Sequence, residues 1–153
     1  MKLKQTSFLA FLILSPFVHA KPIKVLLLDG QNNHNWKATT PVMVKALEKD
    51  DFCKVTVSTS PPKNSPLDAW EPWKPKFSNF DVTLTNYNGE LWPEDLQKSL
   101  TNYVRKGGSF VVVHAANNAF SKWEEYNTMI GLGGWGGRSE QSGPYLYLSL
   151  IHI

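Results

Sequence analysis

The stretch that decides the fold is SFVVVHAANNAF, residues 109–120, which follows the pair Gly107 and Gly108. Its three consecutive valines form a short apolar run of β-branched residues, which is typical of a strand buried on both faces in a parallel sheet. In open parallel sheets, ligands bind beyond the carboxyl ends of the strands. The run ends at His114, so we expect this histidine to lie at a functional edge.

Three further segments have the pattern of strands in the same sheet, and helical patterns separate them. The strands are expected at IKVLLLDG (23–30), FCKVTVS (52–58) and FDVTLTNYNG (80–89). Thr40 as an N-cap and Pro41 as the first helical residue predict a helix that ends near Lys49. A second helix is expected to open at Pro93 and to close at Gly107.

This alternation of strands and helices predicts an α/β fold with a right-handed, doubly wound parallel sheet. The expected strand order is the flavodoxin-like 2-1-3-4, in which the first and third strands flank the topological switch point. Residues 59–77, TSPPKNSPLDAWEPWKPKF, carry five prolines and two tryptophans. We expect this segment to be a long irregular loop without regular elements.

Both ends of the chain are expected to lie outside the folded domain. Residues 1–20 combine early lysines with an apolar core too short to span a bilayer and end in Ala20, which predicts a signal peptide cleaved there. An uncleaved N-terminal anchor is the alternative. LSLIHI, residues 148–153, is the translation of a sequencing-library adaptor and is expected to be an artefact. Residues 21–147 are then a domain truncated at its C-terminus.

The composition excludes several classes of protein. The formal net charge is +3, but Lys2 and Lys4 lie in the expected signal peptide, and no basic run or aromatic-basic stripe of the nucleic-acid-binding kind follows. The single cysteine, Cys53, allows neither a disulfide framework nor a cysteine-based zinc site. Its apolar context favours a small buried side chain. We expect no nucleic-acid partner and, after signal cleavage, no membrane partner.

Amide and aromatic side chains follow the expected first, third and fourth strands, and the carboxyl ends of parallel strands meet at one edge. Amides match sugar hydroxyls as both donors and acceptors, and aromatic rings pack on sugar rings, so these side chains indicate a carbohydrate ligand. A turn-forming role is the alternative for any single asparagine. The candidate substrate-binding residues are Asn32, Trp36, Asn86, Tyr87, Asn88 and Asn117, with Gln31 and Asn118 beside them.

Two histidines, His34 and His114, belong to the same loops. A histidine at a strand end can be a general acid or base, a metal ligand or a hydrogen-bonded structural residue. We expect His114 to be the catalytic acid or base, and His34 to be its partner or a metal ligand. A divalent metal such as zinc needs a third ligand, and Asp29, Glu124 and Glu125 lack diagnostic metal spacing.

The glycine-rich segment near the C-terminus formally contains a dinucleotide-binding motif. GLGGWG, residues 131–136, matches GxGxxG, but it follows the helix-like WEEYNTMIG (123–131) instead of a strand, so nucleotide binding is not expected. No GxSxG elbow and no phosphate-binding loop of the GxxxxGK type is present either. Residues 133–143 are expected to form a flexible rim that displays Trp135 and Arg138 to the substrate.

Several segments together resemble the ThuA-like (trehalose-utilisation) family, whose fold is related to class I glutamine amidotransferases. They are KVLLLDGQNNHNW (24–36), FDVTLTNYNG (80–89), WPEDLQKSLTNYVRKGGSFVVVHAANNAF (92–120) and WEEYNTMIGLGGWGGR (123–138). In the related amidotransferases, a nucleophilic cysteine occupies the strand end where this chain, like the ThuA-like pattern, has His114-Ala115. Glutaminase chemistry is therefore not expected, because the chain has no thiolate or serine there.

The resemblance implies a role in carbohydrate metabolism, with a trehalose-type glycoside or a keto-sugar as substrate. Relatives with a secretion signal are expected in the periplasm or outside the cell. Family members continue beyond this chain with further histidine-containing segments, so a site completed by those segments is expected to be incomplete here. A non-catalytic sugar-binding domain and a zinc-assisted hydrolase remain the alternatives.

Overall fold

The structure is a computed structural model that describes residues 21–131 and residue 133. The expected signal peptide (1–20), the expected artefact (148–153) and the candidate contacts Trp135 and Arg138 lie outside the described residues. Within the described residues, no helix is long and apolar enough to cross a membrane.

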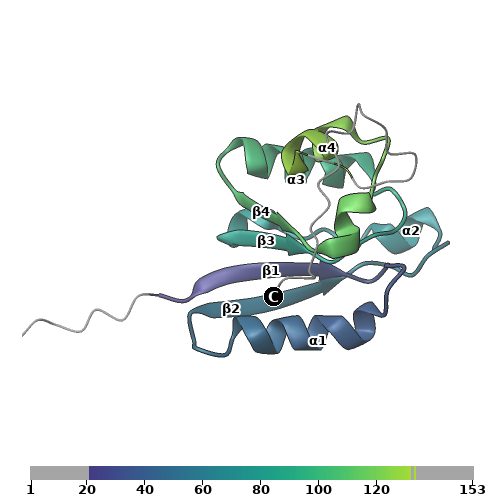
Figure 1. The fold of residues 1–153 in the computed structure, drawn as a ribbon. Helices are drawn as coiled ribbons and strands as arrows, with labels where there is room; N and C mark the ends of the chain where they lie inside the picture. The colour runs from purple at the N-terminus through teal and green to yellow at the C-terminus, as the bar shows by residue number, and fades with distance from the viewer. Residues whose placement is uncertain (1–20, 132, 134–153) are drawn as a thin grey trace, which may run out of the picture.

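Four parallel strands form one sheet (Figure 1). They are β1 (Ile23–Asp29), β2 (Cys53–Thr59), β3 (Val82–Thr85) and β4 (Ser109–Val112). Their order is β2-β1-β3-β4, which confirms the predicted doubly wound topology. Leu27 of β1 pairs with Val57 of β2 on one side and with Leu84 of β3 on the other. The central position explains the unbroken apolar run of β1, because both of its faces are covered.

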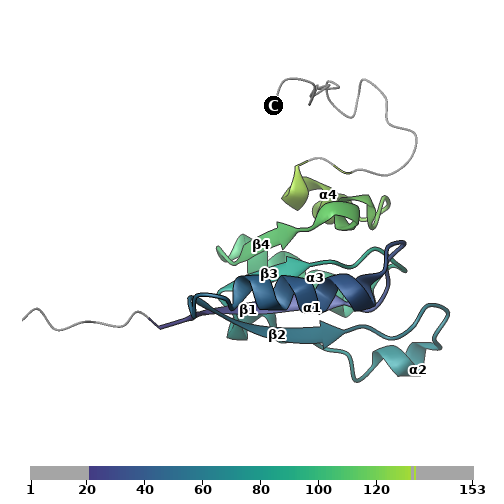
Figure 2. The same ribbon diagram turned by 60° about the horizontal axis from the view of Figure 1, so that its bottom comes forward.

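The helices lie on both faces of the sheet. The chain crosses from β1 to β2 toward one edge of the sheet and from β3 to β4 toward the other edge. Because both crossovers are right-handed, the helices within them lie on opposite faces. Figure 2 shows α1 (Trp36–Leu47) in front of β1 and β2. On the other face, α3 (Glu94–Arg105) lies beside α4 (Glu124–Ile130). Gly107 ends α3 with a backbone φ of +91°, as predicted.

The first helix begins earlier than the sequence predicts. Asn35, not Thr40, is its N-cap: the Asn35 side-chain oxygen accepts a hydrogen bond from the Ala38 N–H at 3.2 Å. Thr40 is buried inside the helix, and Pro41 follows it there. Because proline has no N–H, α1 omits one internal hydrogen bond at this position.

The proline-rich segment is more ordered than predicted. It contains the short helix α2 (Leu67–Trp70) and a 3₁₀ turn, Phe77–Asn79. Trp70, Trp73 and Phe77 are buried in the core, and the Trp73 indole N–H donates to Ser58 Oγ at 3.0 Å. The prolines break regular structure, but the aromatic side chains between them have enough apolar area to hold the segment against the sheet.

The outer strand β4 is less buried than predicted. Val111 is 44% exposed, and the neighbours Phe110 and Val112 are half-buried, so the expectation of burial on both faces is wrong for the described residues. The physical reason is position: β4 is the last strand of the order, and within the described residues nothing covers the face that carries Val111.

Candidate functional site

His114 lies directly beyond β4, in a backbone conformation that is rare for a residue with a side chain. The Val113 N–H makes the last ladder bond, to the Thr85 carbonyl at 2.9 Å, and the chain then turns sharply at His114, whose φ is +46°. A 3₁₀ turn, His114–Asn118, follows, in which Ala115 and Ala116 are buried. The strained turn directs the His114 side chain to the surface while the small alanines pack inward.

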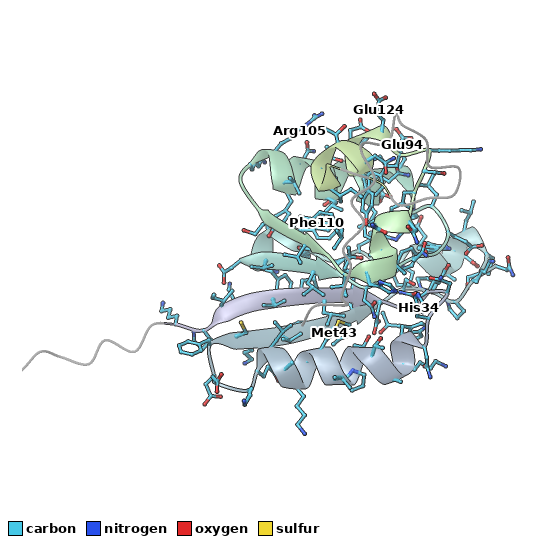
Figure 3. The ribbon with its side chains drawn as sticks, viewed as in Figure 1. His34, Met43, Glu94, Arg105, Phe110 and Glu124 are labelled. Atoms are coloured by element: carbon cyan, nitrogen blue, oxygen red, sulfur yellow. The ribbon has the colours of Figure 1, made fainter. Side chains whose placement is uncertain are left out.

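His34 lies in the loop after β1 (labelled in Figure 3), and Asn32 holds this loop across the end of β3. Asn32 Nδ2 donates to the Asn86 carbonyl at 2.6 Å, while Asn32 Oδ1 accepts from the His34 N–H at 2.9 Å. Asn86 is itself fixed, because its Nδ2 donates to Thr39 Oγ1 on α1 at 3.2 Å. The loop after β1 is thereby drawn toward β4.

The two histidine rings meet as a consequence of this bridge. The ring centroids of His34 and His114 lie 4.7 Å apart with an angle of 44° between the ring planes, and both residues are exposed. Their strands are not neighbours, because β3 lies between β1 and β4. The pair therefore depends on the reach of the loop and not on strand adjacency.

A groove of about 590 Å³ opens beside the loop that carries His34. We call it the amide groove, after the amide side chains in its lining, which includes Gln31, Asn32, Trp36, Lys37, Lys63, Asn88 and Glu90. These residues come from the loops after β1, β2 and β3 and from the first turn of α1, so the groove lies at the carboxyl edge of the sheet. Its size is within the usual range of small-molecule sites.

Gln31 ties the three loops of the amide groove together. Its side chain is only 5% exposed, and its Nε2 donates to the Pro61 carbonyl at 2.9 Å and to Glu90 Oε2 at 3.3 Å. Its Oε1 accepts from the Glu90 N–H at 2.9 Å. A methyl group on Gly89 would come within 2.4 Å of the Gln31 Cβ, so the close approach of the two loops requires glycine there. The groove is therefore built by internal hydrogen bonds.

The structure separates the predicted ligand contacts into three groups. Asn32, Trp36 and Asn88 line the amide groove. Asn117 is half-buried and follows His114 in the 3₁₀ turn. Asn86 is buried and serves the bridge to the loop after β1.

Tyr87 offers no surface to a ligand. Its side chain is 0% exposed and lies among the rings of Trp73, Trp92 and Phe120, while its hydroxyl donates to the Glu90 carbonyl at 2.7 Å. Burial raises the pKa of Tyr87 well above its usual value. The sequence suggested a sugar platform because Tyr87 follows a strand end, but Trp73 of the proline-rich segment covers it together with Trp92 and Phe120.

The three charged residues of the amide groove, Lys37, Lys63 and Glu90, were not predicted from the sequence. Glu90 follows the turn signal Asn88-Gly89, which is the one local sign that its side chain could return to a strand end. The lysines carry no such signal, because single exposed lysines occur on every protein surface.

The described residues contain no group of three or more histidine, cysteine, aspartate or glutamate side chains that could hold a metal ion. His34 and His114 are thus two ligands at most within this part of the chain. A zinc site built on them requires a third ligand from outside it.

The comparisons with known proteins agree with the fold. The model of the ThuA family, described as trehalose utilisation, matches residues 24–146. The chain is 43% identical to a thua-like protein of known crystal structure from Parabacteroides merdae ATCC 43184, with a TM-score of 0.75. The match covers 84% of this chain and 45% of that chain, so this chain spans less than half of the relative's length. No curated protein matches.

Proposed function

The chain belongs to the ThuA (trehalose utilisation) family, and from this premise we propose that it acts on a carbohydrate, either a trehalose-type glycoside or a keto-sugar. The observation that carries the proposal is the contact between His34 and His114, whose ring centroids lie 4.7 Å apart beside the amide groove. The loop of residues 30–36 joins the two features, because it carries His34 and lines the groove.

His114 acts as the general acid or base in this proposal, and His34 is its partner. Histidine is the side chain best suited to take up and release a proton near neutral pH. An adjacent imidazole assists by orienting the reacting ring or by accepting its proton. The strained backbone at His114 presents the ring to solvent and to substrate.

The amide groove holds the part of the substrate that does not react. Asn32 and Asn88 offer amides to hydroxyl groups, and Trp36 offers an aromatic face to a sugar ring. Holding a substrate in this way positions the scissile or oxidised carbon against the histidines and lowers the entropic part of the barrier.

A non-catalytic sugar-binding domain is the second candidate. The observation that favours it is the openness of the site: both histidines are exposed, and within the described residues nothing closes over them. The two candidates make different forecasts, because a binding domain needs the groove but no proton transfer. A zinc-assisted hydrolase is the third, and measurement of metal in the purified protein tests it.

We also propose that the protein works in the periplasm or outside the cell. The support is the pattern of residues 1–20, with early lysines, a short apolar core and the small residue Ala20 at the expected cleavage point. N-terminal sequencing of the exported protein tests this, and a mature chain that begins at Lys21 is the expected result.

The experiment for the catalytic proposal compares His114→Gln with the unchanged chain on trehalose and on keto derivatives of glycosides. Loss of a general acid or base lowers turnover by about a hundredfold or more, while sugar affinity and folding persist. His34→Gln is expected to lower turnover as well. Unchanged turnover in a well-folded His114→Gln variant removes the catalytic role and favours the sugar-binding domain.

A further inference from the structure

The charges that line the amide groove do not balance. Lys37 and Lys63 are cationic, whereas Glu90 is the one carboxylate among the residues that line it. Within the described residues, neither lysine forms an ion pair with a carboxylate. The groove therefore has an excess of positive charge on side chains that internal contacts do not neutralise.

Glu90 is already engaged by the protein. Its two carboxylate oxygens accept from the Asn64 N–H at 3.1 Å, and Oε2 also accepts from Gln31 Nε2 at 3.3 Å. Asn64 has a positive φ of 63°, so this carboxylate fixes the turn directly after Lys63. Glu90 thus helps to hold Lys63 at the rim of the groove. Its carboxylate oxygens bind the Asn64 N–H and the Gln31 amide and pair with no lysine in the described part of the chain.

Lys37 is placed against the aromatic face of the same groove. Its Nζ lies 5.6 Å from the centroid of the Trp36 ring, within the range of a cation–π contact. A ligand that binds at Trp36 therefore meets an ammonium group that lies over one face of the ring. Asn32 and Asn88 supply the neutral donors and acceptors of the same surface.

We propose that the amide groove is a subsite for a sugar that bears an oxyanion, such as a uronate carboxylate or a phosphate ester. This rests on the proposed function only in taking the ligand to be a carbohydrate. The sugar ring packs on Trp36, its hydroxyls bind the asparagine amides, and the oxyanion lies between Lys37 and Lys63. The reacting end of such a substrate extends toward the histidine pair.

The test is a set of titrations of the full chain with glucuronate, glucose, glucose 6-phosphate and acetate, followed by nuclear magnetic resonance or calorimetry. Glucuronate is expected to bind more tightly than glucose or acetate, because each of those has only half of the recognised chemistry. Added salt weakens the preference by screening the lysines. The phosphate arm shows which oxyanion is preferred, and tighter binding of either one than of glucose supports the proposal.

Lys37→Gln and Lys63→Gln are each expected to weaken glucuronate binding by about two- to fivefold, the usual range for exposed charge pairs. Glucose binding stays unchanged in both. Lys45→Gln is the matched control, since Lys45 lies in the last turn of α1 and does not line the groove.

The proposal would be overturned if neither glucuronate nor glucose 6-phosphate binds more tightly than glucose, if none of these sugars binds, or if the lysine variants behave like the Lys45 control. These outcomes are independent of catalysis, because the readout is affinity. If His114→Gln leaves turnover unchanged but the glucuronate preference persists, the catalytic proposal fails and the subsite stands. If turnover depends on His114 but glucose, glucuronate and glucose 6-phosphate all bind alike, the subsite alone fails.

Discussion

Asn32 donates through its Nδ2 to the carbonyl of Asn86 at 2.6 Å, and this bond carries the loop after β1 across the end of β3. The other end of the same amide accepts from the His34 N–H. One side chain therefore connects the topology of the sheet to the contact between the two histidines.

Asn32→Ala removes both hydrogen bonds, so the His34 ring is expected to leave His114. We predict a loss of about 1 to 2 kcal/mol in the free energy of unfolding and a loss of the nuclear Overhauser contacts between the two imidazoles. Asn118→Ala is the control, because Asn118 is exposed and lies at the end of the 3₁₀ turn that begins at His114. Imidazole contacts that persist in Asn32→Ala would show that other forces hold the loop.

The positive φ at His114 lowers stability for any residue with a Cβ, whereas the proposed function requires the histidine side chain there. Glycine adopts a positive φ without the steric penalty that a Cβ brings, so His114→Gly should be more stable than His114→Ala by about 1 kcal/mol. Both variants should lose turnover, because both lack the imidazole. Chemical denaturation of the two variants measures the difference, and equal stabilities would mean that the turn relaxes once the ring is removed.

Two buried tryptophans differ in their polar atoms and give a matched pair. The indole N–H of Trp73 donates to Ser58 Oγ, whereas that of Trp92 has no partner within the described residues. Trp73→Phe should therefore cost about 1 kcal/mol more than Trp92→Phe, since it also leaves the half-buried Ser58 hydroxyl without its donor. Thermal and denaturant unfolding compare them. A larger cost for Trp92→Phe would point to an internal water on its N–H.

The buried tyrosines predict a loss of stability at alkaline pH. Burial raises the pKa of both Tyr87 and Tyr126, so the folded chain keeps their protons where the unfolded chain loses them. The unfolded state then binds fewer protons, and the free energy of unfolding falls as pH rises above the ordinary tyrosine pKa of about 10. Below that pH these groups contribute no slope.

Tyr87→Phe is expected to make the free energy of unfolding fall less steeply with pH under alkaline conditions. The variant also loses the hydrogen bond from the Tyr87 hydroxyl to the Glu90 carbonyl. Denaturant titrations at several pH values between neutral and alkaline conditions measure the slope directly. The exposed variant Phe52→Leu is the control and should leave the slope unchanged. A slope that is the same in Tyr87→Phe and in the unchanged chain would contradict the assignment.

Much of the fold was predictable because its signals are local. The apolar run of β1, the glycine that ends α3 and the alternation of elements lead to the observed strand order. The start of α1 was misplaced because Thr40-Pro41 imitates a helix start, while Asn35 makes the observed cap. The order of the proline-rich segment was underestimated because its tryptophans pack against residues that are distant in the sequence.

The sequence by itself determined the family pattern, the parallel sheet and the placing of His34 and His114 beyond strand ends, since each depends on residue types close together in the chain. Only the tertiary structure decided that the two rings touch, that Tyr87 is withdrawn into the core and that Lys37 and Lys63 share a groove. The physical reason is that these outcomes depend on hydrogen bonds and ring packing between distant segments, such as the bond from Asn32 to Asn86. No periodicity in the chain encodes a contact of that kind.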